Sequence, residues 1–108
     1  MSKGVVQIAW NDDVALLTLN RPERRNAVDL ESLELIQEIQ VEAVSREIRA
    51  LVLTGAPPSF CAGADLAGVR EEVFHEALNK VLRGFTQMPC VTIAAIDGPA
   101  LGAGAQLV

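Results

Sequence analysis

The chain has few residues of the kinds that bind nucleic acids. Nine lysines and arginines stand against 14 aspartates and glutamates, which gives a net charge of −5 and a pI of about 4.7. Tyrosine is absent, and aromatic residues make up only 4% of the chain. Non-specific binding to nucleic acid needs a basic stripe, and base stacking needs aromatic side chains. The composition therefore argues against a nucleic-acid partner.

Cysteine and histidine are also scarce. Cys61 and Cys90 are the only cysteines and His75 the only histidine, and their spacing fits no metal motif. We expect the cysteines to be small buried residues without a disulfide, and His75 to lie on the polar side of a helix. No metal site is predicted.

Long apolar runs are missing as well. No run approaches the roughly 20 residues of a membrane span, and residues 1–4 are not followed by a signal-type apolar segment. We therefore expect a cytoplasmic protein with no membrane partner. Half of the residues are hydrophobic, so one small domain with a buried core is predicted.

Hydrophobic periodicity predicts the order β-β-α-β-α-β, an α/β layer with parallel crossovers. Asp29 is a candidate N-cap for the first helix, with Ser32 as the alternative. The expected strands are 5–10, 14–19, 50–54 and 91–96, and the expected helices run from 30 to about 46 and from 70 to about 86.

The apolar positions also predict which faces are buried. The runs at 50–54 and 91–96 are continuous, which is typical of strands buried on both faces in parallel sheets. The predicted apolar faces of the two helices consist of Leu33, Ile36, Ile39, Val41 and Val44 in the first, and Val73, Ala77, Val81 and Phe85 in the second.

Two segments rich in small residues follow buried strands, and they carry the functional signal. The first is residues 60–66 (FCAGADL), and the second is residues 97–104 (DGPALGAG), which opens a further helix. The carboxyl ends of parallel strands meet at one sheet edge, where ligands usually bind. One backbone N–H from each loop, aimed at a common point, would form an oxyanion hole. Small residues that merely permit tight packing are the plainer explanation, and a phosphate loop is unsupported because no Walker motif is present.

Three blocks in order give a resemblance to a known family. They are NRPERRNA at 20–27, LTG followed by SFCAGADL at 53–66, and DGPALGAG at 97–104. With these blocks the chain resembles the crotonase superfamily, the enoyl-CoA hydratase/isomerase group. The resemblance implies a spiral of β-β-α turns followed by helices that build a homotrimer, often paired into a hexamer. Residues 1–108 would be the N-terminal part of such a domain, truncated before the trimerisation helices.

The resemblance also implies site residues. The N–H groups of Ala64 and Ala103 would form an oxyanion hole around the carbonyl of an acyl-CoA or enoyl-CoA thioester. The ligand is a substrate rather than a bound cofactor, and no other cofactor is implied. Arg24 or Arg25 would meet a CoA phosphate. The loops that would line the CoA path comprise Arg24, Arg25, Asn26 and Ala27, together with Ala62, Gly63, Asp65 and Leu66. For Asp65 a capping role is the plainer alternative.

Gln106 departs from the family pattern. Hydratases of the family use two glutamates to hold and activate water, and Gln106 occupies the position of the first. An amide exchanges no proton at neutral pH, so it cannot serve as a general acid or base. In this respect the chain looks most like actinobacterial paralogues, some of which are thought to bind acyl-CoA without hydrating it.

Two functions follow from these observations. The first is an enzyme of fatty acyl-CoA metabolism, an enoyl-CoA hydratase (a lyase) or isomerase, which stabilises a thioester enolate. The second is a non-catalytic protein that binds or shuttles acyl-CoA. Gln106 favours the second, whereas the two loops suit both.

Overall fold

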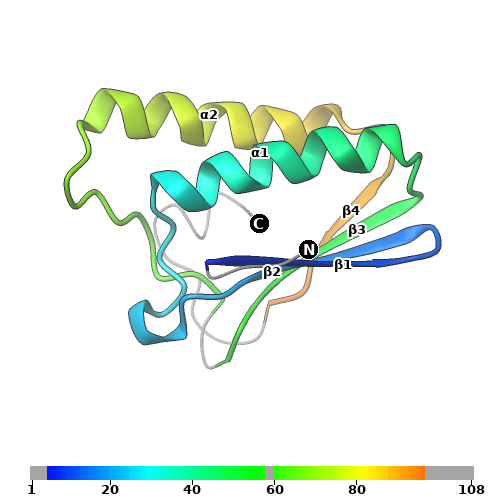
Figure 1. Cartoon of the computed structure of the whole chain (residues 1–108), viewed down its shortest axis with the longest axis horizontal. Coiled ribbons are helices and arrows are strands. Elements are labelled where there is room, and N and C mark those ends of the chain that lie inside the picture. The colour runs from blue at the N-terminus through cyan, green and yellow to red at the C-terminus, as the bar shows by residue number, and fades with distance from the viewer. Residues whose placement is uncertain (1–4, 58–59, 97–108) are drawn as a thin grey trace.

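The computed structural model describes residues 5–57 and 60–96, which form a four-stranded sheet with two helices over it. Figure 1 shows both helices on the same side of the sheet, side by side. The elements are β1 (Val6–Asn11), β2 (Val14–Leu19), the short helix η1 (Pro22–Arg24), α1 (Leu30–Ser45), β3 (Ala50–Gly55), α2 (Glu71–Gln87) and β4 (Val91–Ala94). The predicted order is confirmed, and most boundaries agree within one residue. The last strand is shorter than predicted, and η1 lies in a segment expected to be a loop.

The sheet has the simple order β1-β2-β3-β4. β1 and β2 pair antiparallel across the tight turn at Asp12 and Asp13, where Asp12 has a left-handed φ of 53°. β2, β3 and β4 are parallel neighbours, with Leu17 opposite Leu53 and Leu53 opposite Ala94. Because β2, β3 and β4 point the same way, the loops that follow β2 and β3 leave the sheet at one edge.

Helix α1 begins with a complete capping box. The Asp29 side chain accepts the Ser32 backbone N–H at 2.8 Å, and the Ser32 hydroxyl faces the Asp29 backbone N–H at 3.5 Å. Asp29 is therefore the N-cap and Ser32 its N3 partner. The prediction for this helix start is confirmed.

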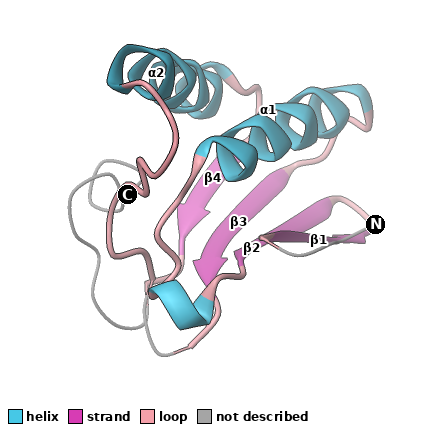
Figure 2. Cartoon of the chain, turned by 60° about the vertical axis from the view of Figure 1, so that its left-hand side comes forward, coloured by secondary structure: helices cyan, strands magenta, loops and turns pink. Residues whose placement is uncertain are grey.

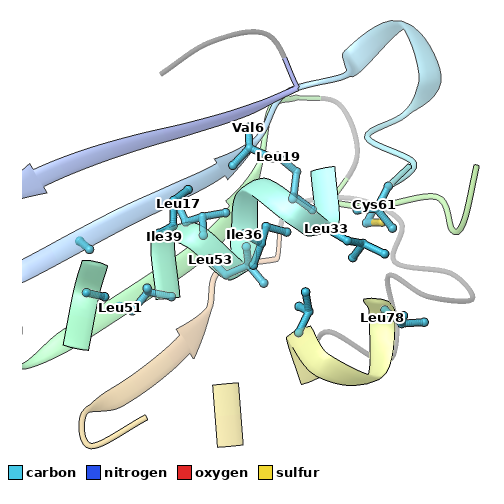
Figure 3. Close-up of a cluster of buried hydrophobic side chains, with 14 of the residues drawn as sticks. Val6, Leu17, Leu19, Leu33, Ile36, Ile39, Leu51, Leu53, Cys61 and Leu78 are labelled. Carbon is cyan, nitrogen blue, oxygen red and sulfur yellow. The ribbon is translucent and has the colours of Figure 1, made fainter. Parts of the chain in front are cut away.

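The core lies between the helices and one face of the sheet. Inward side chains of β2 and β3 meet the inner face of α1, and Figure 3 shows these side chains gathered into one cluster. Fully buried members include Leu17, Leu33, Ile36, Leu51 and Phe60.

The predicted burial of two strands is wrong. Side chains of β3 alternate between buried and half-buried, and β4 is exposed, with Val91 at 61% and Ile93 at 48%. The cause is topological. The crossovers β2-α1-β3 and β3-α2-β4 advance in one direction across the sheet, and crossovers of the same hand then place both helices on one face. No described element covers the other face of the sheet, on which Leu16 lies.

The predicted helix faces also need correction. In α1, Val41 and Val44 are 72% and 47% exposed, because the buried stripe runs through Ile36, Ile39, Gln40 and Ala43. In α2, Val73 is 40% exposed, and the buried stripe is Phe74, Ala77, Leu78 and Val81. The predicted helical period is correct, but the buried stripe of α1 leaves out Val41 and Val44, and that of α2 leaves out Val73.

The two helices approach closely at Gly84. Gln40, which is 7% exposed, donates from Nε2 to the Val81 carbonyl at 3.0 Å. A Cβ added at Gly84 would meet the Gln40 side-chain amide, with Cδ only 2.7 Å away. An alanine here would therefore displace Gln40 from its hydrogen bond.

We expect Gly84→Ala to lower the free energy of unfolding by about 1 kcal/mol, because the lost hydrogen bond and the crowding outweigh alanine's helix propensity. In a Gln40→Ala background the same change is expected to be stabilising by about 1 kcal/mol, since propensity alone then acts. Urea unfolding of the four proteins in this double-mutant cycle gives both values. Equal effects in the two backgrounds would contradict the proposed contact.

Candidate functional site

The candidate site lies where β2 and β3 end. The segment after β2 contains η1 and residues 25–28, and the segment after β3 contains residues 60–66. In Figure 2 the arrowheads of β3 and β4 point toward the side of the molecule on which η1 lies. The loop at residues 25–27 and the loop at residues 62–66, which the family resemblance implies together, therefore lie at one edge of the sheet. The other segment predicted to share this edge, residues 97–104, lies outside the described residues.

Backbone hydrogen bonds join the two loops directly. The Ala62 N–H donates to the Arg25 carbonyl at 2.9 Å. Val28 then forms a parallel bridge with Ala64, in which the Val28 N–H donates to the Gly63 carbonyl at 2.9 Å and the Asp65 N–H donates to the Val28 carbonyl at 2.7 Å. These two hydrogen bonds involve Gly63 and Asp65, the residues on either side of Ala64, and not the Ala64 N–H.

The Ala64 N–H is consequently not used by the bridge. Neighbouring residues of an extended segment direct their N–H groups to opposite sides, so this N–H points away from Val28. Ala64 is exposed, and within residues 5–57 and 60–96 no acceptor meets its N–H. The preceding residue, Gly63, has a φ of 134°, a backbone conformation that residues with side chains rarely adopt.

The first loop carries local strain. Arg25 and Asn26 are consecutive non-glycine residues with left-handed φ values of 52° and 61°. Asn26 is 1% exposed and sits inside the loop: its Oδ1 accepts the Arg21 backbone N–H at 2.8 Å, and its Nδ2 donates to the Ala56 carbonyl at 2.6 Å. Such strained positions persist only where surrounding contacts over-determine them, and they cluster at functional sites.

Charged side chains of this region separate into two groups. Arg24 and Arg25 are exposed, and no ion pair within the described residues involves either. Arg21 is turned inward and contacts Asp65 at 3.0 Å. Sequence reasoning did not single out Arg21, because its partner is 44 residues away and no local pattern marks such a contact.

Asp65 behaves as a cap as well as an ion-pair partner. Its Oδ1 accepts the Ala67 N–H at 3.2 Å. This hydrogen bond first, and the Arg21 side chain second, lower the pKa of the Asp65 carboxyl below its ordinary value. The carboxylate is therefore ionised at neutral pH, and its contacts weaken only when the pH falls below the ordinary carboxyl range.

Cys61 is not a nucleophile in this arrangement. It is fully buried, and burial raises the pKa of its thiol, so the thiol stays protonated at neutral pH. Both cysteines are free, although Cys90 is only partly buried.

His75 is exposed on α2, as predicted. Within the described residues no group of three metal-ligating side chains is found, and neither helix is long and apolar enough to cross a membrane.

The remaining predicted residues fall into two classes. Ala27, Ala62, Gly63 and Leu66 lie in the joined loops, and the Ala27 carbonyl accepts a hydrogen bond from Arg21 at 2.8 Å. Ala103 and Gln106 lie outside the described residues, so the second donor and the position of the first family glutamate stay predictions.

Comparisons with known proteins agree with this fold. "Probable enoyl-CoA hydratase echA6" of Mycobacterium tuberculosis is 36% identical over 104 residues, covering 95% of this chain and 43% of its own length. "Probable enoyl-CoA hydratase EchA14" of the same species is 40% identical over 109 residues, with 94% and 43% covered. The chain thus spans less than half the length of these relatives.

Solved structures give the same result. An enoyl-CoA hydratase of Mycobacterium smegmatis superposes with a TM-score of 0.89 at 29% identity, covering 97% of this chain and 44% of that one. An enoyl-CoA hydratase of Bacillus anthracis gives a TM-score of 0.84 at 34% identity, with 96% and 44% covered. The predicted α/β, crotonase-like architecture is confirmed. Residues 9–108 match the family model described as enoyl-CoA hydratase/isomerase, and the chain belongs to that family.

Proposed function

We propose that the protein binds a fatty acyl-CoA or enoyl-CoA thioester at the carboxyl edge of the sheet and stabilises its enolate with the Ala64 N–H. Ala103 would supply the second donor. The observation that carries the proposal is the Ala64 N–H itself, which belongs to an exposed residue, has no acceptor in the described part of the chain, and is held on both sides by bonds to Val28. A preorganised donor of this kind stabilises the oxygen charge that develops in the transition state.

The test removes this one N–H. Ala64 is replaced by lactic acid in the intact natural protein, which changes the peptide into an ester and leaves the methyl group in place. Cys61 offers a native ligation site three residues upstream. We expect turnover of a trans-2- or 3-enoyl-CoA to fall by about 10²- to 10³-fold, since one oxyanion donor is lost.

The matched control is the same ester at Gly68, whose N–H also has no acceptor in the described segments. Its turnover should equal that of the wild type. Equal losses at both positions would refute the oxyanion role of Ala64, and absence of thioester binding by the wild type would refute the whole proposal. Tight binding without any turnover would instead assign the protein to the acyl-CoA binding class, which Gln106 favours.

Arg24 and Arg25 are the proposed partners of the CoA phosphates, because both are exposed beside the joined loops. We expect Arg24→Ala and Arg25→Ala to raise the dissociation constant of an acyl-CoA about tenfold in at least one case, since a charge-assisted hydrogen bond is lost. The binding of the corresponding acyl-pantetheine, which lacks the nucleotide, should stay unchanged. Arg83→Ala, an exposed arginine on α2, is the control, and calorimetric titration measures all three.

The other implications of the family resemblance stay predictions. They are a place in fatty acid metabolism, a cytoplasmic location and assembly into a homotrimer or hexamer. The full protein's substrate and acyl chain length are to be determined with the same titrations.

A further inference from the structure

Arg21 makes an unusual set of contacts for an arginine in a surface loop. Its side chain is only 12% exposed. Nη1 donates to the Ala27 carbonyl at 2.8 Å and lies 3.5 Å from the Asp29 carboxylate, while Nη2 donates to the Asp65 carboxylate at 3.0 Å. The guanidinium therefore connects the first loop, the cap of α1 and the second loop.

These contacts exclude the ordinary role of an arginine near a CoA site. Each terminal nitrogen already faces oxygen atoms of the protein, and little of the side chain reaches solvent. A phosphate would have to displace a carboxylate and a carbonyl to reach it. Arg24 and Arg25, which are exposed, are better placed for that role.

Asp65 is held from three directions. Its backbone N–H is bonded to Val28, one carboxylate oxygen accepts the Ala67 N–H, and the other accepts from Arg21. The peptide group that joins Ala64 to Asp65 is thus anchored on its Asp65 side. The Ala64 N–H itself belongs to the preceding peptide group, which joins Gly63 to Ala64 and whose carbonyl accepts the Val28 N–H at 2.9 Å.

We propose that Arg21 is a positioning residue: its ion pair with Asp65 holds the backbone on the far side of Ala64 and so, together with the two bonds to Val28, keeps the Ala64 N–H in its direction. This inference rests on the proposed function of that N–H. A misplacement of about 1 Å in a catalytic group costs about 10²-fold in rate. The ion pair therefore acts on the chemistry without touching the substrate.

The test uses Arg21→Lys and Asp65→Asn in the intact natural protein. Lysine keeps the charge but cannot reach the Ala27 carbonyl and Asp65 together in the same fork geometry. Asparagine keeps the shape and the acceptor for the Ala67 N–H, and removes the charge. The primary readout is the red shift in the absorption of a chromophoric enoyl-CoA thioester on binding, because this shift reports how strongly the thioester carbonyl is polarised.

We expect both variants to lose most of the red shift, while the dissociation constant of the thioester rises less than about tenfold. Turnover should fall by about 10²-fold with a much smaller change in KM. The double variant should resemble the single ones, because each removes the same contact. Arg46→Lys is the control: this exposed arginine pairs with Glu42 at 2.7 Å, far from the loops, and its variant should behave as the wild type.

Four results would overturn the inference. If the variants melt at a lower temperature but keep the wild-type shift and turnover, Arg21 is only a structural anchor. If both variants fail to fold, its role is again structural. If the wild type binds the thioester but shows no shift, the oxyanion role of Ala64 fails and the positioning role fails with it. If the wild type and the variants all show the same red shift, the Arg21 inference is refuted but the oxyanion role of Ala64 is not.

Discussion

Replacing Gln106 by glutamate is expected to raise the rate of hydration of a trans-2-enoyl-CoA by about 10²- to 10⁴-fold, the usual contribution of a positioned general acid or base. The expectation rests on the sequence, because Gln106 lies outside the described residues and only the family resemblance implies that it takes the position of the first family glutamate. A glutamine holds water by hydrogen bonds but exchanges no proton with it. The measurement is the loss of enoyl thioester absorbance, with the hydrated product identified by its mass.

The control for this gain is Gln106→Asn, which keeps the amide and shortens the side chain, and should add nothing. A carboxylate that acts as a base must also give a rate that rises with pH through its pKa. A Gln106→Glu variant that binds the thioester but stays as slow as the wild type would show that a second catalytic carboxylate is lacking. The protein would then belong to the acyl-CoA binding class.

Local chemistry explains which parts of the fold were predictable. The first helix was placed correctly because Asp29 and Ser32 form a capping box, a signal contained within four residues. The loop at 60–66 was found because small residues follow the apolar strand at 50–54. In both cases the responsible groups are neighbours in sequence.

Long-range geometry explains what was missed. Arg21 and Asp65 are 44 residues apart, and nothing near either one indicates the other. The exposure of Ile93 and Val41 was missed for a related reason. An apolar residue shows that a face can be buried, but the strand order and the hand of the crossovers decide which faces the helices cover.

Asn26→Leu is expected to have the largest effect on stability, lowering the free energy of unfolding by about 4 kcal/mol. The Arg21 N–H and the Ala56 carbonyl each lose a buried partner, at about 1–3 kcal/mol apiece. The left-handed φ of 61° adds a further penalty of about 1–2 kcal/mol for a side chain that makes no local hydrogen bond there. Urea unfolding monitored by circular dichroism measures the change.

Two further variants separate these causes. Asn26→Gly removes the side-chain hydrogen bonds but accepts the left-handed backbone, so it should be less damaging than leucine by about the conformational penalty of 1–2 kcal/mol. Asn26→Asp keeps the acceptor for the Arg21 N–H and tolerates the backbone, but it turns an oxygen toward the Ala56 carbonyl and buries a carboxylate, so its loss combines these two effects. A leucine variant as stable as the wild type would show that the loop does not depend on Asn26. The expected order, wild type above Asp and Gly with Leu lowest, would show that one buried amide holds together the loop that carries Arg24 and Arg25.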